Sequence, residues 1–114
     1  MVTTEEARKL ALSFPEVVEL PHFERTSFRV NKKIFATMAE KEKLVMVKLS
    51  LIDQSAFCAF DKTIIYPVPG GWGKQGATYI ELKKIRKSVL KDALITAYYG
   101  VAPKKITDLI KTKR

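Results

Sequence analysis

The chain has 114 residues, of which 46% are hydrophobic and 29% are charged, so it is long enough for one globular domain and too apolar for a disordered protein. Its 21 Lys and Arg residues outnumber 12 Asp and Glu, giving a formal net charge of +9. With one cysteine, no signal-peptide pattern and no apolar run near about 18 residues, the sequence excludes an internal disulfide and predicts a cytoplasmic protein without a membrane span.

The positive charge is distributed unevenly along the chain. Residues 1–57 carry nine basic and eight acidic groups, whereas residues 58–114 carry twelve and four. A field of this sign favours phosphate-rich partners, although a basic surface also serves solubility alone.

The first half predicts one helix and four strands. Thr3 with Glu6 forms a capping-box pattern, and Pro15 ends the helix that follows. Alternation along the next runs directs Arg29 away from the core, and Asn31-Lys32-Lys33 places Lys32 and Lys33 at a hairpin tip. The short connections favour an antiparallel meander of Val17–Leu20, Thr26–Val30, Ile34–Ala39 and Leu44–Leu49.

The second half predicts a helix, two strands and two further helices. Ser50 with Asp53 caps a helix that ends near Asp61, and Cys58 within it is expected to be a small buried hydrophobe. The apolar face of this helix is predicted to consist of Ile52, Ala56, Ala59 and Phe60. The strands are Ile64–Val68, where Pro67 indicates a sheet edge, and Ala77–Leu82.

A long helix is predicted from about Ile85 to Gly100, and a short one from Pro103 to Ile110. Basic residues gather at the start of the long helix, where cations oppose the helix dipole: Lys83, Lys84, Arg86, Lys87 and then Lys91. The complete order, α–β–β–β–β–α–β–β–α–α, predicts a single α+β domain over residues 1–114. It is a two-layer fold in which helices pack mainly on one face of an antiparallel sheet.

The loop between the last two strands holds four of the five glycines and the only tryptophan. Residues 71–76 match G-x-G-x-x-G formally, but a strand and not a helix is predicted to follow, and the Walker A pattern also fails. Two interpretations remain. The backbone N–H groups and Lys74 could hold a phosphate while Trp72 faces a base, or the loop is structural and Trp72 folds over the core.

No catalytic set accompanies this loop. His22 is the only histidine, and no motif places a nucleophile beside it. One cysteine and one histidine cannot assemble a usual zinc site. We therefore expect no metal, no cofactor and no enzymatic activity.

Several stretches together resemble the MmcQ/YjbR (DUF419-type) family of small bacterial proteins. They are Leu12-Ser-Phe-Pro-Glu-Val, Ser27-Phe-Arg-Val with Lys33-Ile-Phe-Ala, Lys48-Leu-Ser, Tyr66 through Tyr79, and Ala97-Tyr with Val101-Ala-Pro-Lys-Lys. The family often has Trp at the position of Ala77. The resemblance implies a layered fold like that of the type III secretion chaperones and a "double wing" for DNA binding, the wings here being Asn31–Lys33 and Gly70–Gly76.

The sequence thus leads to a non-enzymatic DNA-binding domain that is mainly phosphate-directed and tolerant of sequence, and we expect a monomer. The expected phosphate contacts are Lys32, Lys33, Lys74, Lys104 and Lys105. Arg25 and Arg29 would reach the backbone or a groove, and Trp72 and Gln75 would contact bases or sugars. The alternative is a protein- or peptide-binding module that uses the sheet face or an edge strand.

Overall fold

A computed structural model describes residues 1–102 and contains one six-stranded antiparallel sheet. Its strands are β1 (Val17–His22), β2 (Arg25–Val30), β3 (Lys33–Ala39), β4 (Leu44–Lys48), β5 (Ile65–Pro67) and β6 (Ala77–Glu81). The helices are α1 (Thr4–Leu12), α2 (Leu51–Cys58), α3 (Gly71–Lys74) and α4 (Lys87–Val101). The predicted terminal helix, with Lys104 and Lys105, lies outside the described residues.

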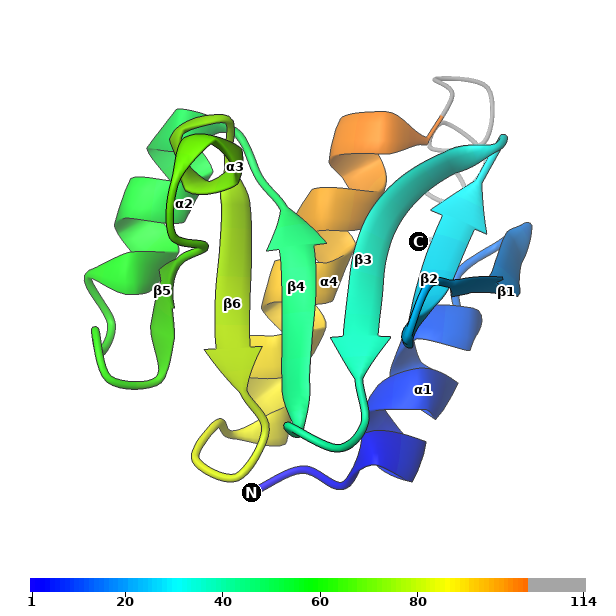
Figure 1. Ribbon diagram of the computed structural model, residues 1–114, viewed down its shortest axis with the longest axis horizontal. Helices are drawn as coiled ribbons and strands as arrows, with labels where there is room; N and C mark the ends of the chain where they lie inside the picture. The colour runs from blue at the N-terminus through cyan, green and yellow to red at the C-terminus, as the bar shows by residue number, and fades with distance from the viewer. Residues whose placement is uncertain (103–114) are drawn as a thin grey trace.

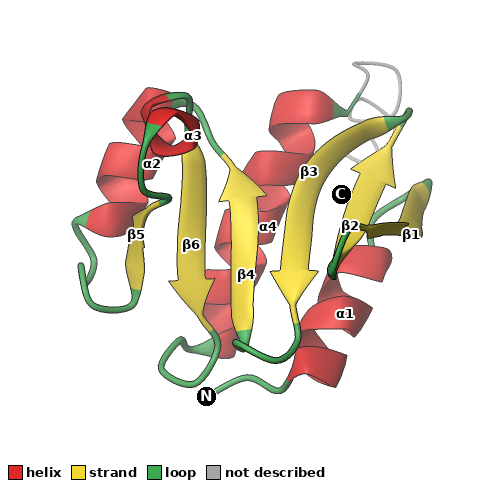
Figure 2. Ribbon diagram, in the orientation of Figure 1, coloured by secondary structure: helices red, strands yellow, loops and turns green. Residues whose placement is uncertain are grey.

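The strand order is β1-β2-β3-β4-β6-β5, so the only crossing of sequence order is at β6, which inserts between β4 and β5. In Figure 1, α4 passes behind β3 and β4 and α1 lies below β2, which leaves the facing side of the sheet without a helix across its centre. Figure 2 shows the same two layers by element type. The predicted α+β class, with helices on one face, is confirmed.

Local sequence explains most element ends. The Thr3 hydroxyl accepts a hydrogen bond from the Glu6 amide at 3.1 Å, and the Glu6 carboxylate accepts one from the Thr3 amide, so the predicted capping box forms. Ser50 caps α2 in the same way through the Asp53 amide. Strand β5 is an edge strand, as Pro67 predicts, because its outer neighbour position is empty in the sheet order.

The core lies between the sheet and the helices α1 and α4. Tyr98 of α4 is 1% exposed, packs between Phe14 and Phe35, and donates its hydroxyl to the Pro15 carbonyl at 2.8 Å. Phe28 pairs with Ala36 and Arg29 pairs with Ile34, so Phe35 is an extra residue in β3, a β-bulge. Phe35 and Ala36 are both fully buried, and the residues that follow them to Ala39 are buried as well.

The predicted apolar face of α2 is wrong. Ile52 is 83% exposed and Phe60, just beyond the helix, is 53% exposed, while Ala56 and Ala59 are also exposed. The inward face instead carries Gln54, which is buried, with Phe57 and the half-buried Cys58 against the core. Gln54 points inward because its side-chain amide is hydrogen-bonded to the Gly73 and Ala77 carbonyls and to the Thr78 hydroxyl. These hydrogen bonds outweigh the apolar periodicity of the helix.

Two further boundaries differ from the prediction. The glycine loop is not a plain connection between strands, because Gly71–Lys74 forms the single helical turn α3. Helix α4 begins at Lys87 and not near Ile85, so Lys83 and Lys84 lie in the preceding turn and Arg86 is the N-cap residue. Of the basic group, only Lys87 and Lys91 therefore belong to the helix. Lys87 Nζ lies 3.7 Å from Glu6 Oε2 of α1.

Candidate functional site: the open face of the sheet

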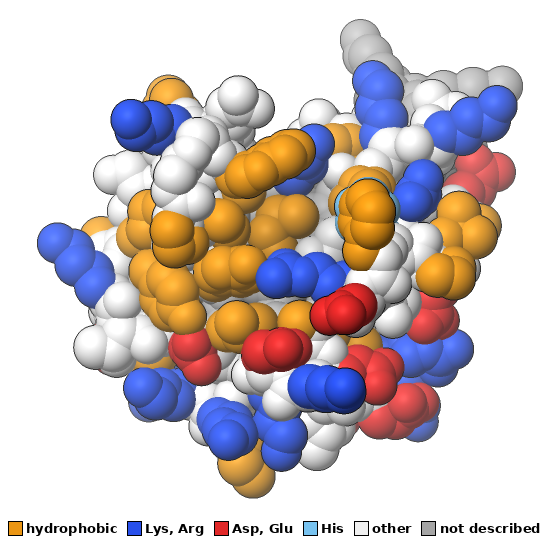
Figure 3. All heavy atoms as spheres, in the orientation of Figure 1, with side chains coloured by type: hydrophobic (Ala, Val, Ile, Leu, Met, Phe, Trp, Pro, Cys, Tyr) orange, Lys and Arg blue, Asp and Glu red, His pale blue; other side chains and the backbone are white. Residues whose placement is uncertain are grey.

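The side of the sheet that faces away from α4 is largely apolar, and it is called the open face here. Cross-strand pairing and alternation place Leu20 and His22 of β1, Thr37 of β3, and Leu44 and Met46 of β4 on it. Strand β6 contributes Ala77 and Tyr79. Figure 3 shows hydrophobic side chains gathered across the centre of this face, with charged side chains around them.

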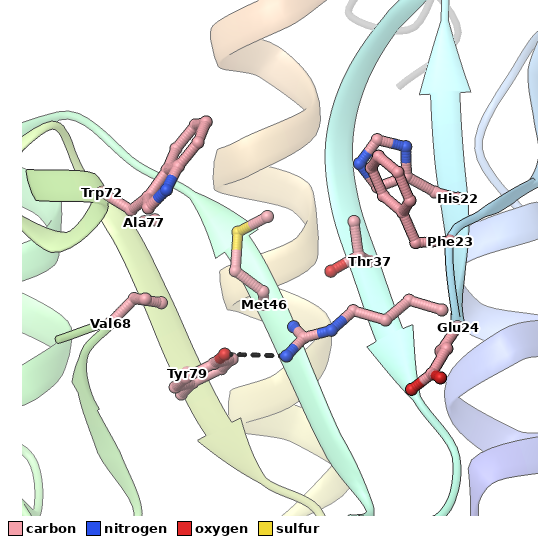
Figure 4. Close-up of a pocket in the computed structure, with 10 residues that line it drawn as sticks. His22, Phe23, Glu24, Thr37, Met46, Val68, Trp72, Ala77 and Tyr79 are labelled. Carbon is pink, nitrogen blue, oxygen red and sulfur yellow. Dashed lines mark hydrogen bonds between the residues drawn. The ribbon is translucent and has the colours of Figure 1, made fainter. Parts of the chain in front are cut away.

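A hollow of about 610 Å³ lies in the open face. It is lined from both sides of the sheet centre by His22, Phe23, Glu24, Arg25, Thr37, Met46, Val68, Trp72, Ala77 and Tyr79. In Figure 4, Trp72 and Ala77 stand on one side and His22 and Phe23 on the other, with Met46 and Thr37 between them. Residues almost 60 positions apart in the chain thus share one concave surface.

Two exposed aromatic side chains form the opposite rims of this hollow. Trp72 of α3 is 68% exposed, and Phe23 in the β1–β2 turn is 94% exposed. Trp72 is therefore not folded over the core, so this part of the structural interpretation of the loop is wrong. Phe23 also has φ of 59°, in the left-handed region that bulky side chains avoid.

Arg25 extends into the hollow from β2. Its Nη2 donates to the Tyr79 hydroxyl at 3.0 Å, the bond drawn dashed in Figure 4, and its Cζ lies 5.5 Å from the centre of the Tyr79 ring. Tyr79 in turn packs edge-on against Tyr66, whose hydroxyl donates to the Glu81 carboxylate. Burial, followed by that carboxylate, raises the pKa of Tyr66 to about 12. This chain of contacts fixes where the guanidinium of Arg25 sits.

The glycine loop is built to hold α3 tightly against its neighbours. A Cβ on Gly73 would overlap the Val68 carbonyl oxygen, and one on Gly76 would overlap that of Leu49, while Gly76 also has φ of 104°. Gln54 donates to the Gly73 carbonyl at 2.9 Å from beneath. The Gln75 and Gly76 amides bond within the loop, so these two N–H groups are already used and do not form the predicted phosphate cradle.

The described residues that were predicted to contact phosphates fall mainly into two groups at one edge of the sheet, the edge at which β3 begins and β4 ends. Lys32 and Lys33 are exposed at the β2–β3 hairpin, and Lys74 and Gln75 are exposed at the end of α3. Figure 1 shows the hairpin and α3 at the same edge, on either side of the β4 end. Arg29 stands apart from Arg25 and donates from Nε to the Ser27 hydroxyl at 3.0 Å.

Sequence reasoning missed three contributors to this surface. Lys48 ends β4 between the two groups; it is exposed, pairs with Ala77 and shares the open face with Met46. Alternation along β4 was a sufficient signal for it. Phe23 and Tyr79 gave no comparable signal, because only the fold brings them to the hollow.

Acidic side chains lie on the other side of Arg25. A second hollow of about 500 Å³ is lined by Phe23, Arg25 and, from two turns, Glu24, Glu40 and Glu42 together with Lys41; Glu24 also lines the first hollow. The open face is therefore polarised, with lysines at the α3 edge and carboxylates toward the β3–β4 turn. An anionic group is favoured at the lysine edge and disfavoured beside the carboxylates of the β3–β4 turn.

The described part of the chain offers few side chains that are arranged for catalysis or for metal binding. His22 contacts the Phe23 ring, and Cys58, whose pKa is raised by burial, sits on α2 outside the hollow. Among residues 1–102, no three His, Cys, Asp or Glu side chains are grouped closely enough to hold a metal ion. None of the described helices is both long and apolar enough to cross a membrane.

Comparison with known proteins places the fold and the family. No curated protein matches the chain. Among solved structures, a crystal structure of Deinococcus radiodurans protein DR2400, a DUF419 domain, is similar with a TM-score of 0.79 at 18% sequence identity, covering 92% of this chain and 82% of that one. The family model YjbR matches residues 12–111. The resemblance drawn from the sequence is thus confirmed, and the chain belongs to the YjbR family.

Proposed function

We propose that the protein is a non-enzymatic, cytoplasmic DNA-binding protein that contacts mainly phosphates and tolerates sequence. The observation that supports this most directly is the set of lysines at one edge of the sheet. Lys32 and Lys33 project from one tip and Lys74 from the other, and Lys48 stands between them. A polyanion laid along this edge meets cations at three successive points.

The backbone at the tip of the β2–β3 hairpin is strained, and the stability of the hairpin does not explain why this strain is kept. Asn31 and Lys32 have φ of 51° and 68°, and the pair Val30–Lys33 closes them into a two-residue turn with both central residues left-handed. Such a turn favours Asn followed by Gly. Lys32 occupies the glycine position, so a charged side chain is retained where glycine would fit with less strain.

The test is a titration of a labelled DNA duplex with the full-length protein at about 50 and about 200 mM salt. Neutralising about four phosphates gives a log–log slope of affinity on salt near −3.6. Lys74→Ala and Lys32→Gly should each flatten the slope by about 0.9, and Lys32→Gly should not lower the melting temperature. Lys91→Ala is the matched control, because Lys91 is exposed on α4, behind the sheet.

Two results would refute this proposal. One is a slope near zero; the other is a slope that Lys91→Ala flattens as much as Lys74→Ala does. The second result would mean that DNA responds to net charge alone and not to this edge.

A second candidate function, binding of a protein or peptide, rests on the exposed apolar side chains of β1. Val18 is 51% exposed and Leu20 44% exposed, on a strand that, among residues 1–102, has β2 on one side and no strand on the other. An extended peptide could add to such an edge, with alternate side chains over the open face. Binding of this kind would survive high salt, whereas phosphate-directed binding would not.

A further inference from the structure

We propose that the hollow of the open face holds an unpaired nucleobase, so that the protein prefers single-stranded over duplex DNA. This inference rests on the DNA-binding function proposed above and names the form of DNA that the same surface takes. Bases in a duplex are stacked and paired, and their faces are unavailable to a protein surface. An unpaired base presents both faces and its polar edge.

The shape and lining of the hollow fit a planar ring. Its volume of about 610 Å³ is within the range of about 300–1,000 Å³ that small-molecule sites occupy. The rims are the aromatic rings of Trp72 and Phe23, and the floor includes Met46 and Ala77. Aromatic faces at an open rim suit base stacking, which any of the four bases can provide.

The polar groups of the hollow fit the edge of a base. Arg25 brings guanidinium donors, and its position is fixed by the bond to Tyr79 at 3.0 Å. Thr37 adds a hydroxyl that can donate or accept, and His22 adds a ring nitrogen at the Phe23 rim. Base edges carry both donors and acceptors, so a mixed set of this kind suits them better than a purely cationic one.

Phe23 is the residue that a purely structural account leaves unexplained. Its ring is 94% exposed, so it contributes almost nothing to the core, and its φ of 59° adds backbone strain. Strain of this kind, kept at an exposed position, is typical of functional sites. A ring that closes over a stacked base would explain both features.

Charge gives the bound strand its direction. Lys48 and Lys74 stand at the α3 edge beside Ala77 and Trp72, whereas Glu40 and Glu42, with Lys41 between them, line the neighbouring hollow beyond Arg25; Glu24 lines both hollows. The phosphates on both sides of an inserted base would therefore follow the lysine edge and avoid the carboxylates. An uncharged aromatic ligand would gain nothing from this arrangement.

The experiment uses Trp72 as its own reporter, since it is the only tryptophan in the chain. The full-length protein is titrated at about 50 mM salt with a 12-nucleotide oligothymidylate, with the same strand made abasic, and with a 12-base-pair duplex. Stacking on Trp72 should quench its emission with the oligothymidylate alone. That strand should bind at least about fivefold more tightly than the abasic strand.

Variants separate the hollow from the rest of the surface. Phe23→Gly and Trp72→Ala should each weaken binding of labelled oligothymidylate by about fivefold or more, and Trp72→Phe should restore most of it because a ring remains. Phe60→Ala is the matched control, since Phe60 is an exposed aromatic that does not line the hollow. Phe23→Gly should keep or raise the melting temperature, because it removes the strained φ.

The outcomes distinguish this inference from the function on which it rests. If no DNA of any form binds, both fail. If the duplex and the abasic strand bind as tightly as oligothymidylate and Trp72 emission does not change, the phosphate-directed function stands and the base pocket is wrong.

A free nucleotide could supply the same base, so thymidine monophosphate is titrated alongside. Quenching by the monophosphate with much weaker affinity than the strand supports a base held within DNA. Quenching by the monophosphate with no gain from the strand would overturn that assignment and indicate a mononucleotide site.

Discussion

Replacing Gly76 by alanine is expected to destabilise the protein far more than the same change at Gly71 in the same loop. Gly76 has φ of 104°, and a Cβ there would overlap the Leu49 carbonyl oxygen and lie 3.0 Å from the carbonyl carbon. The Leu49 amide also donates to the Gly76 carbonyl at 3.0 Å, so the two backbones cannot separate without losing this bond. Gly71 has open space around its Cβ position.

The magnitude follows from two contributions to the free energy of unfolding. Forcing a non-glycine residue into this backbone region costs about 1–3 kcal/mol, and the steric overlap costs about 1–3 kcal/mol more. The total, about 2–6 kcal/mol, is a large part of the roughly 5–15 kcal/mol that stabilises a typical domain. Gly71→Ala should be neutral or slightly stabilising, because alanine favours a helical turn.

Urea denaturation followed by far-UV circular dichroism measures both variants. With a urea m-value of about 1–3 kcal/mol/M, a loss of 2 kcal/mol lowers the midpoint by roughly 1 M. Free energies of unfolding for Gly76→Ala and Gly71→Ala that agree within about 0.5 kcal/mol would refute the packing explanation for the loop glycines.

Three further changes probe other supports of the site. Gln54→Leu should lower the free energy of unfolding, measured in urea, by about 1–3 kcal/mol. The loss should be toward the lower end, because the Gly73 and Ala77 carbonyls each keep a backbone amide partner. Ser55→Ala, on the exposed side of α2, is the control and should lower it much less. Tyr98→Phe should cost about 0.5–1.5 kcal/mol, since it removes the hydroxyl bond to Pro15 and keeps the ring; no loss would show that this bond contributes nothing net. The pKa of Tyr66, raised from 10.0 to about 12, contributes stability that is complete below pH 10 and lost as pH rises to 12, so Tyr66→Phe should lose less stability than the wild type over that interval.

Signals that are local in the chain predicted the local structure well. The capping box at Thr3, the cap at Ser50 and the edge position of Pro67 depend on neighbours within a few residues, and the structure has all three. The face of α2 was mispredicted because its decisive contacts are 19 to 24 residues away: Gln54 bonds Gly73, Ala77 and Thr78. A glutamine has no apolar signal, so periodicity assigned the inward face to Ile52 and its neighbours.

The candidate site shows the same difference between features that depend on neighbouring residues and features that depend on residues far apart in the chain. Lys32 and Lys33 were predicted at a hairpin tip from turn residues alone, and they lie there, whereas Lys74 of the predicted loop ends the helical turn α3. The hollow was not predicted, because Phe23 and Trp72 are far apart in the chain and only the folded sheet places them on opposite rims of it. The left-handed φ of Phe23 left no trace in the sequence either, since the pattern of such a turn predicts Gly or Asn there.

The glycine loop unites the two interpretations that its sequence left open. Its glycines are structural, because Gly73 and Gly76 allow the loop backbone to pack closely against the carbonyls of Val68 and Leu49. Gln54 holds the loop by donating a hydrogen bond to the Gly73 carbonyl. Yet the side chain that this support carries, Trp72, is turned outward and adds little to the core. A flexible loop would lose entropy each time Trp72 stacked on a ligand, whereas a turn already fixed on three sides loses little. The rigidity of the loop would therefore lower the entropy cost of the base stacking proposed for Trp72.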